Sequence, residues 1–261
     1  MIIFEKKNHL YLNNINEKYT SATTFLKNFT EKKDWSEIAN QYFKAGVKNA
    51  INKFCKKEQI NKKEFEDIFK NEEFNSESLL KYWDKKGKEK ADIGTYWHKI
   101  KENNIDENET DEKISFDLEN NSNLLGEYKE FILYSHRYKI AGQSDKITIF
   151  NDKSFIIEDY KFIKELNFNS HIKRNQEKEF FLAPINHIEY CNGNLYTLQL
   201  SLYAYLLEEY GYKCKNLFLL HNVLNEKGTE ILKENKIEVN YLKKEIKNLL
   251  NFHELKNIIL K

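Results

Sequence analysis

The 261-residue sequence has little of what divides a chain into domains: it contains one proline and eight glycines. No segment rich in proline, glycine or serine forms a linker, and there is no internal repeat. We therefore expect a single domain over residues 1–261. Three cysteines, Cys55, Cys191 and Cys214, lie far apart and lack the spacing of a zinc or iron–sulfur site. Free thiols in a reducing compartment account for them best.

Long hydrophobic runs are also missing. The N-terminal segment becomes charged at Glu5, so it does not resemble a secretory signal, and no apolar run approaches membrane-spanning length. Positive and negative charges nearly cancel, with 42 Lys and Arg against 41 Asp and Glu. We therefore expect a cytoplasmic protein without a membrane partner. Any surface that binds anions must arise from local clustering.

The distribution of apolar residues predicts an α/β fold. Residues 2–12 indicate a hairpin, and Ser21 lies in a plausible helix N-cap region. Residues 35–101 are mostly helical in periodicity, with one buried stripe expected. The positions of that stripe are Ile38, Tyr42, Val47, Ile51 and Phe54. Later segments are expected to be strands at residues 131–162, 217–224 and 231–239, and helices at residues 195–210 and 241–260. We predict a mainly helical N-terminal section, residues 1–123, packed on an α/β core, residues 124–261.

One expected strand, FIIEDYKF (Phe155–Phe162), carries charges inside a core-like pattern. Because side chains alternate between the faces of a strand, Asp159 and Lys161 share one face and Glu158 points to the other. Burying charged groups on such a face costs free energy, so these groups must be paired with opposite charges or with a cation. The alternative is an exposed hairpin end, where Lys161 forms a surface ion pair.

The preceding strand, residues 140–150, is joined to this one by the turn Asn151-Asp152-Lys153. A three-residue loop pairs Phe150 with Ser154 and brings Asp145 opposite Asp159, on the same face. Two carboxylates so placed repel each other, and a divalent cation between them would remove the repulsion. A loop of two or four residues would shift the register by one and lose the opposition.

Four short motifs in order resemble the RecB-like branch of the PD-(D/E)xK nuclease superfamily. They are GTYWH (Gly94–His98), AGQSD (Ala141–Asp145), EDYK (Glu158–Lys161) and QLSLY (Gln199–Tyr203). The stretch YTSATTFLKNF is similar to the opening of phage and mitochondrial exonucleases of this branch. The resemblance implies a restriction-endonuclease-like core, in which a small central mixed sheet is flanked by helices and carries the acidic hairpin.

The resemblance also implies roles for individual residues. Asp145 and Asp159 would be metal ligands, together with the backbone carbonyl of Tyr160, and His98 would lie beside or on the metal. Lys161 would position the attacking water and stabilise charge on the phosphate.

Other roles follow from the same resemblance. Gln199 and Tyr203 would orient the site and contact the strand being cut. Glu130 is the candidate for an additional acid, with Glu127 as its competitor. A register slip would exchange Asp159 for Glu158.

Oxygen ligands favour one or two Mg²⁺ or Mn²⁺ ions, and no iron–sulfur cluster is expected from the cysteine spacing. The segment HIKRNQEKEFF combines Lys173, Arg174 and Lys178 with aromatic residues, which suits a nucleic-acid strand. Its alternative is a solvated loop with two core phenylalanines, Phe180 and Phe181. Since no GxxxxGK[ST] loop is present, a helicase or recombination partner would be a separate chain.

The function these features indicate is a metal-dependent DNA nuclease, namely an exonuclease on single strands or DNA ends. Recombination, repair or viral genome processing would use such an enzyme, in the host cytoplasm if it is viral. A structure-specific or defence endonuclease is the alternative enzyme. A nuclease-derived DNA-binding or assembly subunit is the alternative without catalysis.

Overall fold

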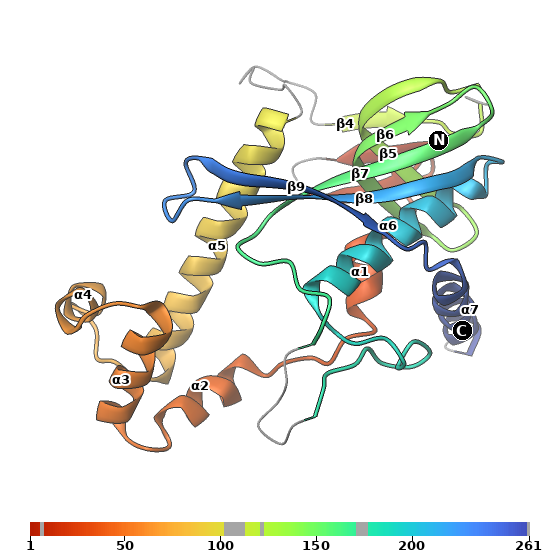
Figure 1. Cartoon of the computed structure of the whole chain (residues 1–261). Helices are drawn as coiled ribbons and strands as arrows, with labels where there is room; N and C mark the ends of the chain where they lie inside the picture. Colours follow the sequence, from red (N-terminus) through yellow and green to blue (C-terminus); the bar gives the residue numbers. More distant parts are fainter. Residues whose placement is uncertain (6–7, 102–112, 121–122, 171–176, 260–261) are drawn as a thin grey trace. The chain divides into compact units, whose positions relative to one another are not determined.

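The computed structural model describes residues 1–5, 8–101, 113–120, 123–170 and 177–259 (Figure 1). The chain folds into two compact units. The sheet unit comprises residues 1–31 and 97–261, and the helical unit comprises residues 32–96. The sequence-based division after residue 123 differs from this one, because the first 31 residues add strands to the sheet and do not join the helices.

A mixed sheet forms the centre of the sheet unit, with nine strands among the described residues. Their order is β4 (Lys113–Phe116), β1 (Ile2–Glu5), β2 (Leu10–Asn13), β3 (Lys18–Ser21), β6 (Ile140–Ile149), β7 (Ser154–Phe162), β8 (Lys213–Leu224) and β9 (Ile231–Val239). The remaining strand, β5 (Gly126–Ser135), pairs antiparallel with β6. The pairs β3–β6 and β7–β8 are parallel. The sheet is larger than the small one expected, because β1 to β4 extend it.

Helices α1 (Ala22–Lys27), α6 (Asn192–Glu208) and α7 (Lys243–Ile259) pack together beside the sheet (Figure 1). Helix α6 has apolar residues around its whole circumference, because it packs against the sheet as well as against α1 and α7. Leu198, Leu202 and Leu206 in it are fully buried. The Ser21 side chain caps α1 by accepting from the Thr24 N–H at 3.2 Å. The prediction of an α/β fold with a mixed sheet flanked by helices is confirmed.

The helical unit contains α2 (Trp35–Phe43), α3 (Val47–Glu58), α4 (Lys62–Ile68) and most of α5 (Ser76–Lys101). Aromatic residues such as Tyr42, Phe54 and Phe65 form its core. The prediction of one buried stripe from Ile38 to Phe54 is wrong. Helix α2 ends at Phe43, the chain turns at Gly46, which has a φ of 88° and precedes α3 as its N-cap, and Val47 is 51% exposed.

The β6–β7 hairpin has the predicted register. The Phe150 N–H donates to the Ser154 carbonyl at 2.9 Å, and Lys153 takes the left-handed φ of 59° that closes the three-residue turn. Recorded pairs run from Ile149↔Phe155 to Lys146↔Glu158. A turn of two or four residues is therefore excluded.

Other predicted elements are confirmed with shifted ends. The hairpin at residues 2–12 is β1 and β2, and the strands at residues 217–224 and 231–239 are β8 and β9. The first of the two expected helices, α6, begins three residues earlier than predicted and is followed by Gly211 at a φ of 83°. In none of the described helices did we find a segment both long and apolar enough to cross a membrane.

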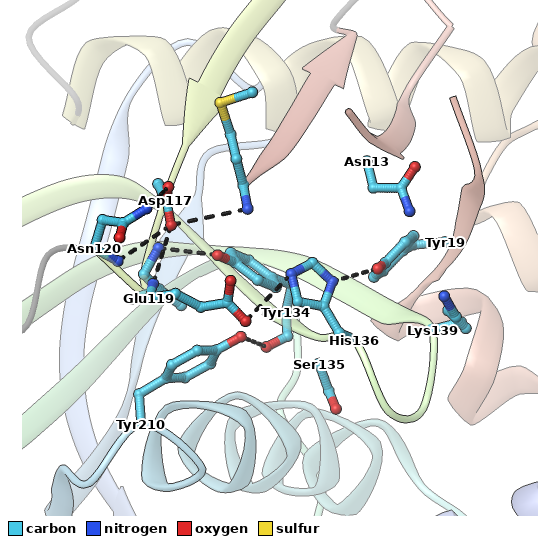
Figure 2. A network of polar contacts seen from close by, with 12 residues as sticks. Asn13, Tyr19, Asp117, Glu119, Asn120, Tyr134, Ser135, His136, Lys139 and Tyr210 are labelled. Atoms are coloured by element: carbon cyan, nitrogen blue, oxygen red, sulfur yellow. Dashed lines mark hydrogen bonds and ion pairs between the residues drawn. The ribbon is translucent and has the colours of Figure 1, made fainter. Parts of the chain in front are cut away.

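A network of polar contacts joins distant parts of the sheet unit (Figure 2). The Tyr19 hydroxyl of β3 contacts Nδ1 of His136, which follows β5, and His136 Nε2 lies 3.6 Å from Glu119. Nearby, the Leu118 N–H donates to the Tyr134 hydroxyl at 2.9 Å. These polar groups lie where β3, β5 and the segment after β4 meet. The contacts satisfy their hydrogen-bonding capacity, which would otherwise be lost on burial.

Candidate active site

The site begins where the β6–β7 ladder opens. Hydrogen-bonded pairs alternate along an antiparallel ladder, so after Lys146↔Glu158 the next would join Ser144 and Tyr160. The ladder stops before that pair, and the Tyr160 N–H donates instead to Asp145 Oδ2 at 2.6 Å. The Asp145 carboxylate thus takes the place of a backbone carbonyl. Its side chain is 14% exposed and remains fixed at the opening.

Asp159 and Lys161 lie on the same face of β7 and form an ion pair, as their alternation predicts. Asp159 is 2% exposed. Burial alone would lower the pKa of Lys161, but Asp159 and Asp145 outweigh that effect and raise the pKa above its ordinary value. The lysine is therefore a buried cation held by two carboxylates.

Glu158 lies on the opposite face and does not replace Asp159. It forms ion pairs with Lys236 at 2.5 Å and Lys146 at 3.1 Å. Burial would raise the pKa of Glu158, but these two lysines outweigh it and lower the pKa. The ambiguity between the two neighbouring carboxylates is thereby resolved in favour of Asp159 as the residue beside Lys161.

His98 reaches this cluster from the last turn of α5. Only this end of the helix, from Trp97 onward, belongs to the sheet unit. Its Nδ1 lies 3.5 Å from Asp145 Oδ2, and its ring meets Phe162 edge-on with centroids 5.2 Å apart. The neighbouring Trp97 donates its indole N–H to the Gly228 carbonyl at 2.8 Å, in the turn between β8 and β9. This contact holds the turn of α5 that carries His98.

Helix α6 supplies the amide and the phenol of the fourth motif. Gln199 Nε2 donates to the Tyr203 hydroxyl at 2.9 Å. Burial, and then the charge of Asp159, raise the pKa of Tyr203 well above its usual range. Gly142 in β6 makes room for this ring, because a Cβ there would lie 2.5 Å from Tyr203 Cε1. The glycine of the AGQSD motif is therefore required by packing.

The structure also separates the two candidates for the additional acid. The β5–β6 register places Glu130 opposite Asp145, and Glu130 has a left-handed φ of 50°. Its charge raises the pKa of the buried Tyr11, although burial is the larger cause. Glu127 lies on the other face, where it pairs with Lys146 at 3.0 Å. The flanking pairs Lys129↔Lys146 and Phe131↔Ser144 thus put Glu130 on the face of Asp145 and Glu127 on the other face.

Tyr196 is a site residue that sequence reasoning missed. Its ring centroid lies 4.6 Å from Lys161 Nζ, which is a cation–π contact. Tyr196 precedes Gln199 by three residues and Tyr203 by seven on α6. That helical spacing was a usable signal, because residues three and seven apart share a face.

The basic segment after β7 does not converge on the cluster in the part that the structure describes. Lys173 and Arg174 lie outside the described residues. Lys178 pairs with Glu189, which also accepts from the Ser170 N–H at 3.0 Å. Of the two phenylalanines expected in the core, Phe181 is buried and Phe180 is 43% exposed.

The carboxylate oxygens of Asp145 and Asp159 suit a hard cation, most of whose ligands would be water and phosphate oxygens. No group of three or more His, Cys, Asp or Glu side chains that could hold a metal occurs within the described ranges. Mg²⁺ typically binds proteins through one or two carboxylates together with water and phosphate, and Asp145 and Asp159 are carboxylates of this kind. Asp159 Oδ2 is buried, and the Lys161 ammonium forms its ion pair with this oxygen, so the carboxylate already faces a cationic group.

Comparisons with known proteins add little to this geometry. No protein-family model matches the chain, and no curated protein does. A solved structure of a protein from Eubacterium rectale, provisionally named an exonuclease, is 14% identical, with 92% of this chain and 78% of that chain covered. Its TM-score of 0.34 is too low to carry an argument. The protein is defined by its own structure, a mixed α/β fold with a buried carboxylate–lysine cluster.

Proposed function

We propose that this protein is a metal-dependent nuclease that hydrolyses phosphodiester bonds in DNA, acting as an exonuclease on single strands or ends. The observation that carries the proposal is the cluster at the ladder opening. Asp145 and Asp159 converge there on Lys161, whose raised pKa keeps it cationic. A binding module without catalysis would not need a buried ammonium between two carboxylates, since burying such groups is costly.

The residues of the cluster divide the work as follows. Asp145 and Asp159 provide oxygen ligands for one or two Mg²⁺ or Mn²⁺ ions, with the Tyr160 carbonyl as a further ligand and His98 beside them. Such an ion lowers the pKa of bound water and neutralises phosphate oxygens. Lys161 stabilises negative charge that develops on the phosphate, since its ammonium is already fixed in the site.

Further residues hold the substrate in this proposal. Gln199 and Tyr203 contact the strand being cut, and Glu130 is the additional acid. Cys55, Cys191 and Cys214 are free thiols, which supports a reducing, cytoplasmic setting. A helicase or recombination partner, where one acts with this protein, is a separate chain.

The test is a time course with Mg²⁺ or Mn²⁺ on single-stranded, duplex and flapped DNA labelled at either end. We expect mononucleotides to be released from one end. Asp159→Ala and Lys161→Ala are each expected to reduce the rate by at least about 100-fold, the size of effect typical for charge-stabilising groups. Glu130→Gln should reduce it, whereas the matched variant Glu127→Gln should not, because Glu127 lies on the other face.

Two outcomes would count against the proposal. Internal cuts in closed circles would contradict the exonuclease mode and favour an endonuclease. Equal behaviour of the wild type, Asp159→Ala and Lys161→Ala on every DNA and RNA substrate would contradict catalysis altogether.

A further inference from the structure

The helical unit contains a cavity of about 890 Å³. Its walls come from α2, α3, α4 and α5 and from the segments that join the last three of these helices. Nine of the thirteen α5 residues from Ser78 to Lys90 line it, so the lined stretch of helix is about 18 Å long. Most of its lining residues are exposed, so the cavity is open to solvent at the surface of the unit and is not a void in the packed core.

Large aromatic rings lie at this cavity. Trp35 is 57% exposed and meets Trp83 edge-on, with ring centroids 6.0 Å apart. Tyr82 also lines the cavity and donates its hydroxyl to Glu58 at 3.0 Å. An exposed tryptophan beside a second one is costly to leave in water, and such rings are the surfaces on which nucleic-acid bases stack.

Lysines accompany these rings. Lys57 Nζ lies 5.4 Å from the Trp83 ring centroid, and Lys86 Nζ lies 5.9 Å from that of Tyr82. Lys81, Lys85 and Lys90 also line the cavity. Four acidic residues also line the cavity. Glu58 accepts from Tyr82, Glu72 pairs with Lys81 and Glu89 pairs with Lys86, and the fourth is Asp67. The unit as a whole has fifteen lysines against twelve acidic residues, an excess of three positive charges.

Gly87 is a second, independent feature of the cavity. It lies inside α5, where glycine is less favourable than alanine by roughly 1 kcal/mol. A Cβ at this position would meet nothing within 4 Å. The packing of the helical unit therefore does not require this glycine, which is exposed at the cavity.

We propose that this cavity binds a segment of single-stranded nucleic acid. Bases stack on Trp35 and Trp83, and Lys57 and Lys85 contact the phosphates. This inference rests on the proposed function for its substrate class and adds a second binding site, on a unit separate from the carboxylate–lysine cluster. Stacking on rings and contacts between lysines and phosphates do not distinguish one base from another, so we expect binding to be independent of base sequence.

The test measures binding without cleavage, using the full chain with Asp159→Ala and a chelator. Fluorescence anisotropy with labelled single-stranded DNA of mixed sequence gives the Kd. Trp35→Ala is expected to weaken binding at least about fivefold, the lower limit for one lost stacked base. Trp35→Phe, which keeps a ring, should stay within about twofold.

Charge variants provide a matched comparison. The double variant Lys57→Gln/Lys85→Gln should lower the salt slope of log K by about 0.7 for each lost phosphate contact. Lys62→Gln/Lys63→Gln makes the same charge change on α4, outside the cavity lining, and should leave the slope closer to that of the parent. Gly87→Leu should raise the melting temperature of the helical unit and yet weaken binding.

The inference is overturned if no single strand binds, or if the Trp35, Lys57/Lys85 and Gly87 variants bind like the parent. An RNA strand of the same sequence distinguishes the two sources of this ligand chemistry. If Trp35→Ala loses binding but the protein never cuts DNA, the result would support nucleic-acid binding at the cavity and contradict the proposed nuclease activity. If the protein cuts DNA in a metal-dependent way but every cavity variant has an unchanged Kd, the result would contradict binding at the cavity and leave the proposed nuclease activity intact.

Discussion

At the scale of single residues, Lys161 has an ammonium whose charge depends on its neighbours. Its side chain is 13% exposed, so solvent contributes little to its stability. Burial would lower its pKa, and only the proximity of Asp159 and Asp145 reverses that effect. The Tyr196 ring lies over the same ammonium. The position of Lys161 is thus set by two anions and one aromatic face.

Tyr196→Leu removes the ring beside Lys161 and is expected to lower kcat while leaving KM nearly unchanged. A cation–π contact contributes roughly 0.5–2 kcal/mol, so a loss of about 2- to 30-fold in kcat is expected. Tyr196→Phe keeps the ring and should stay close to the wild type. Steady-state kinetics with Mg²⁺ measure both variants. Equal losses in the two would show that the hydroxyl matters and the ring does not.

At the scale of elements, polar side chains fix two features of the sheet. β6 and β7 part where Asp145 accepts from the Tyr160 N–H, which is how a regular hairpin yields an open site. β3 is held to the end of β5 by the contact between Tyr19 and His136 (Figure 2). Burial lowers the pKa of His136, so the folded chain favours the neutral ring.

The stability of the sheet unit is therefore expected to fall as the pH drops below the ordinary His136 value of 6.5. The lowered pKa means that the unfolded chain takes up a proton first, so the contribution is complete above pH 6.5 and is lost as the pH falls through the folded pKa. Glu119 and Asp117 favour the proton, whereas Lys139 and the N-terminal ammonium oppose it.

His136→Gln tests this expectation, because it should flatten the fall in melting temperature between pH 7 and pH 5. His187→Gln is the matched control, since that ring is 60% exposed and lies 3.5 Å from Glu245. Identical pH slopes for the wild type and His136→Gln would contradict the role given to burial.

At the scale of the whole molecule, the two units have separate cores. The core of the helical unit centres on Phe54, which meets Phe65, Phe69, Phe74 and Tyr82 at centroid distances of 5.0–5.7 Å. The sheet unit has its own core, in which Phe155 is fully buried. Each unit therefore carries the apolar contacts that stabilise it.

Phe54→Ala is expected to lower the free energy of unfolding of the helical unit by about 3–5 kcal/mol, through lost burial and the cavity it leaves. Hydrogen exchange should then accelerate in residues 32–96 and much less in the sheet unit. Phe155→Ala should show the opposite pattern. Equal acceleration in both units from Phe54→Ala would mean that they unfold as one.

The amino-acid sequence by itself determined the hairpin and the cluster on it, because these depend on local rules. Strand alternation put Asp159 beside Lys161, and the three-residue turn brought Asp145 to the same place. Only the tertiary structure brought Tyr196 to Lys161, divided the chain into two units and put Glu130 and Glu127 on opposite faces of the sheet. These outcomes rest on contacts between residues far apart in the chain, which periodicity and turn length do not encode.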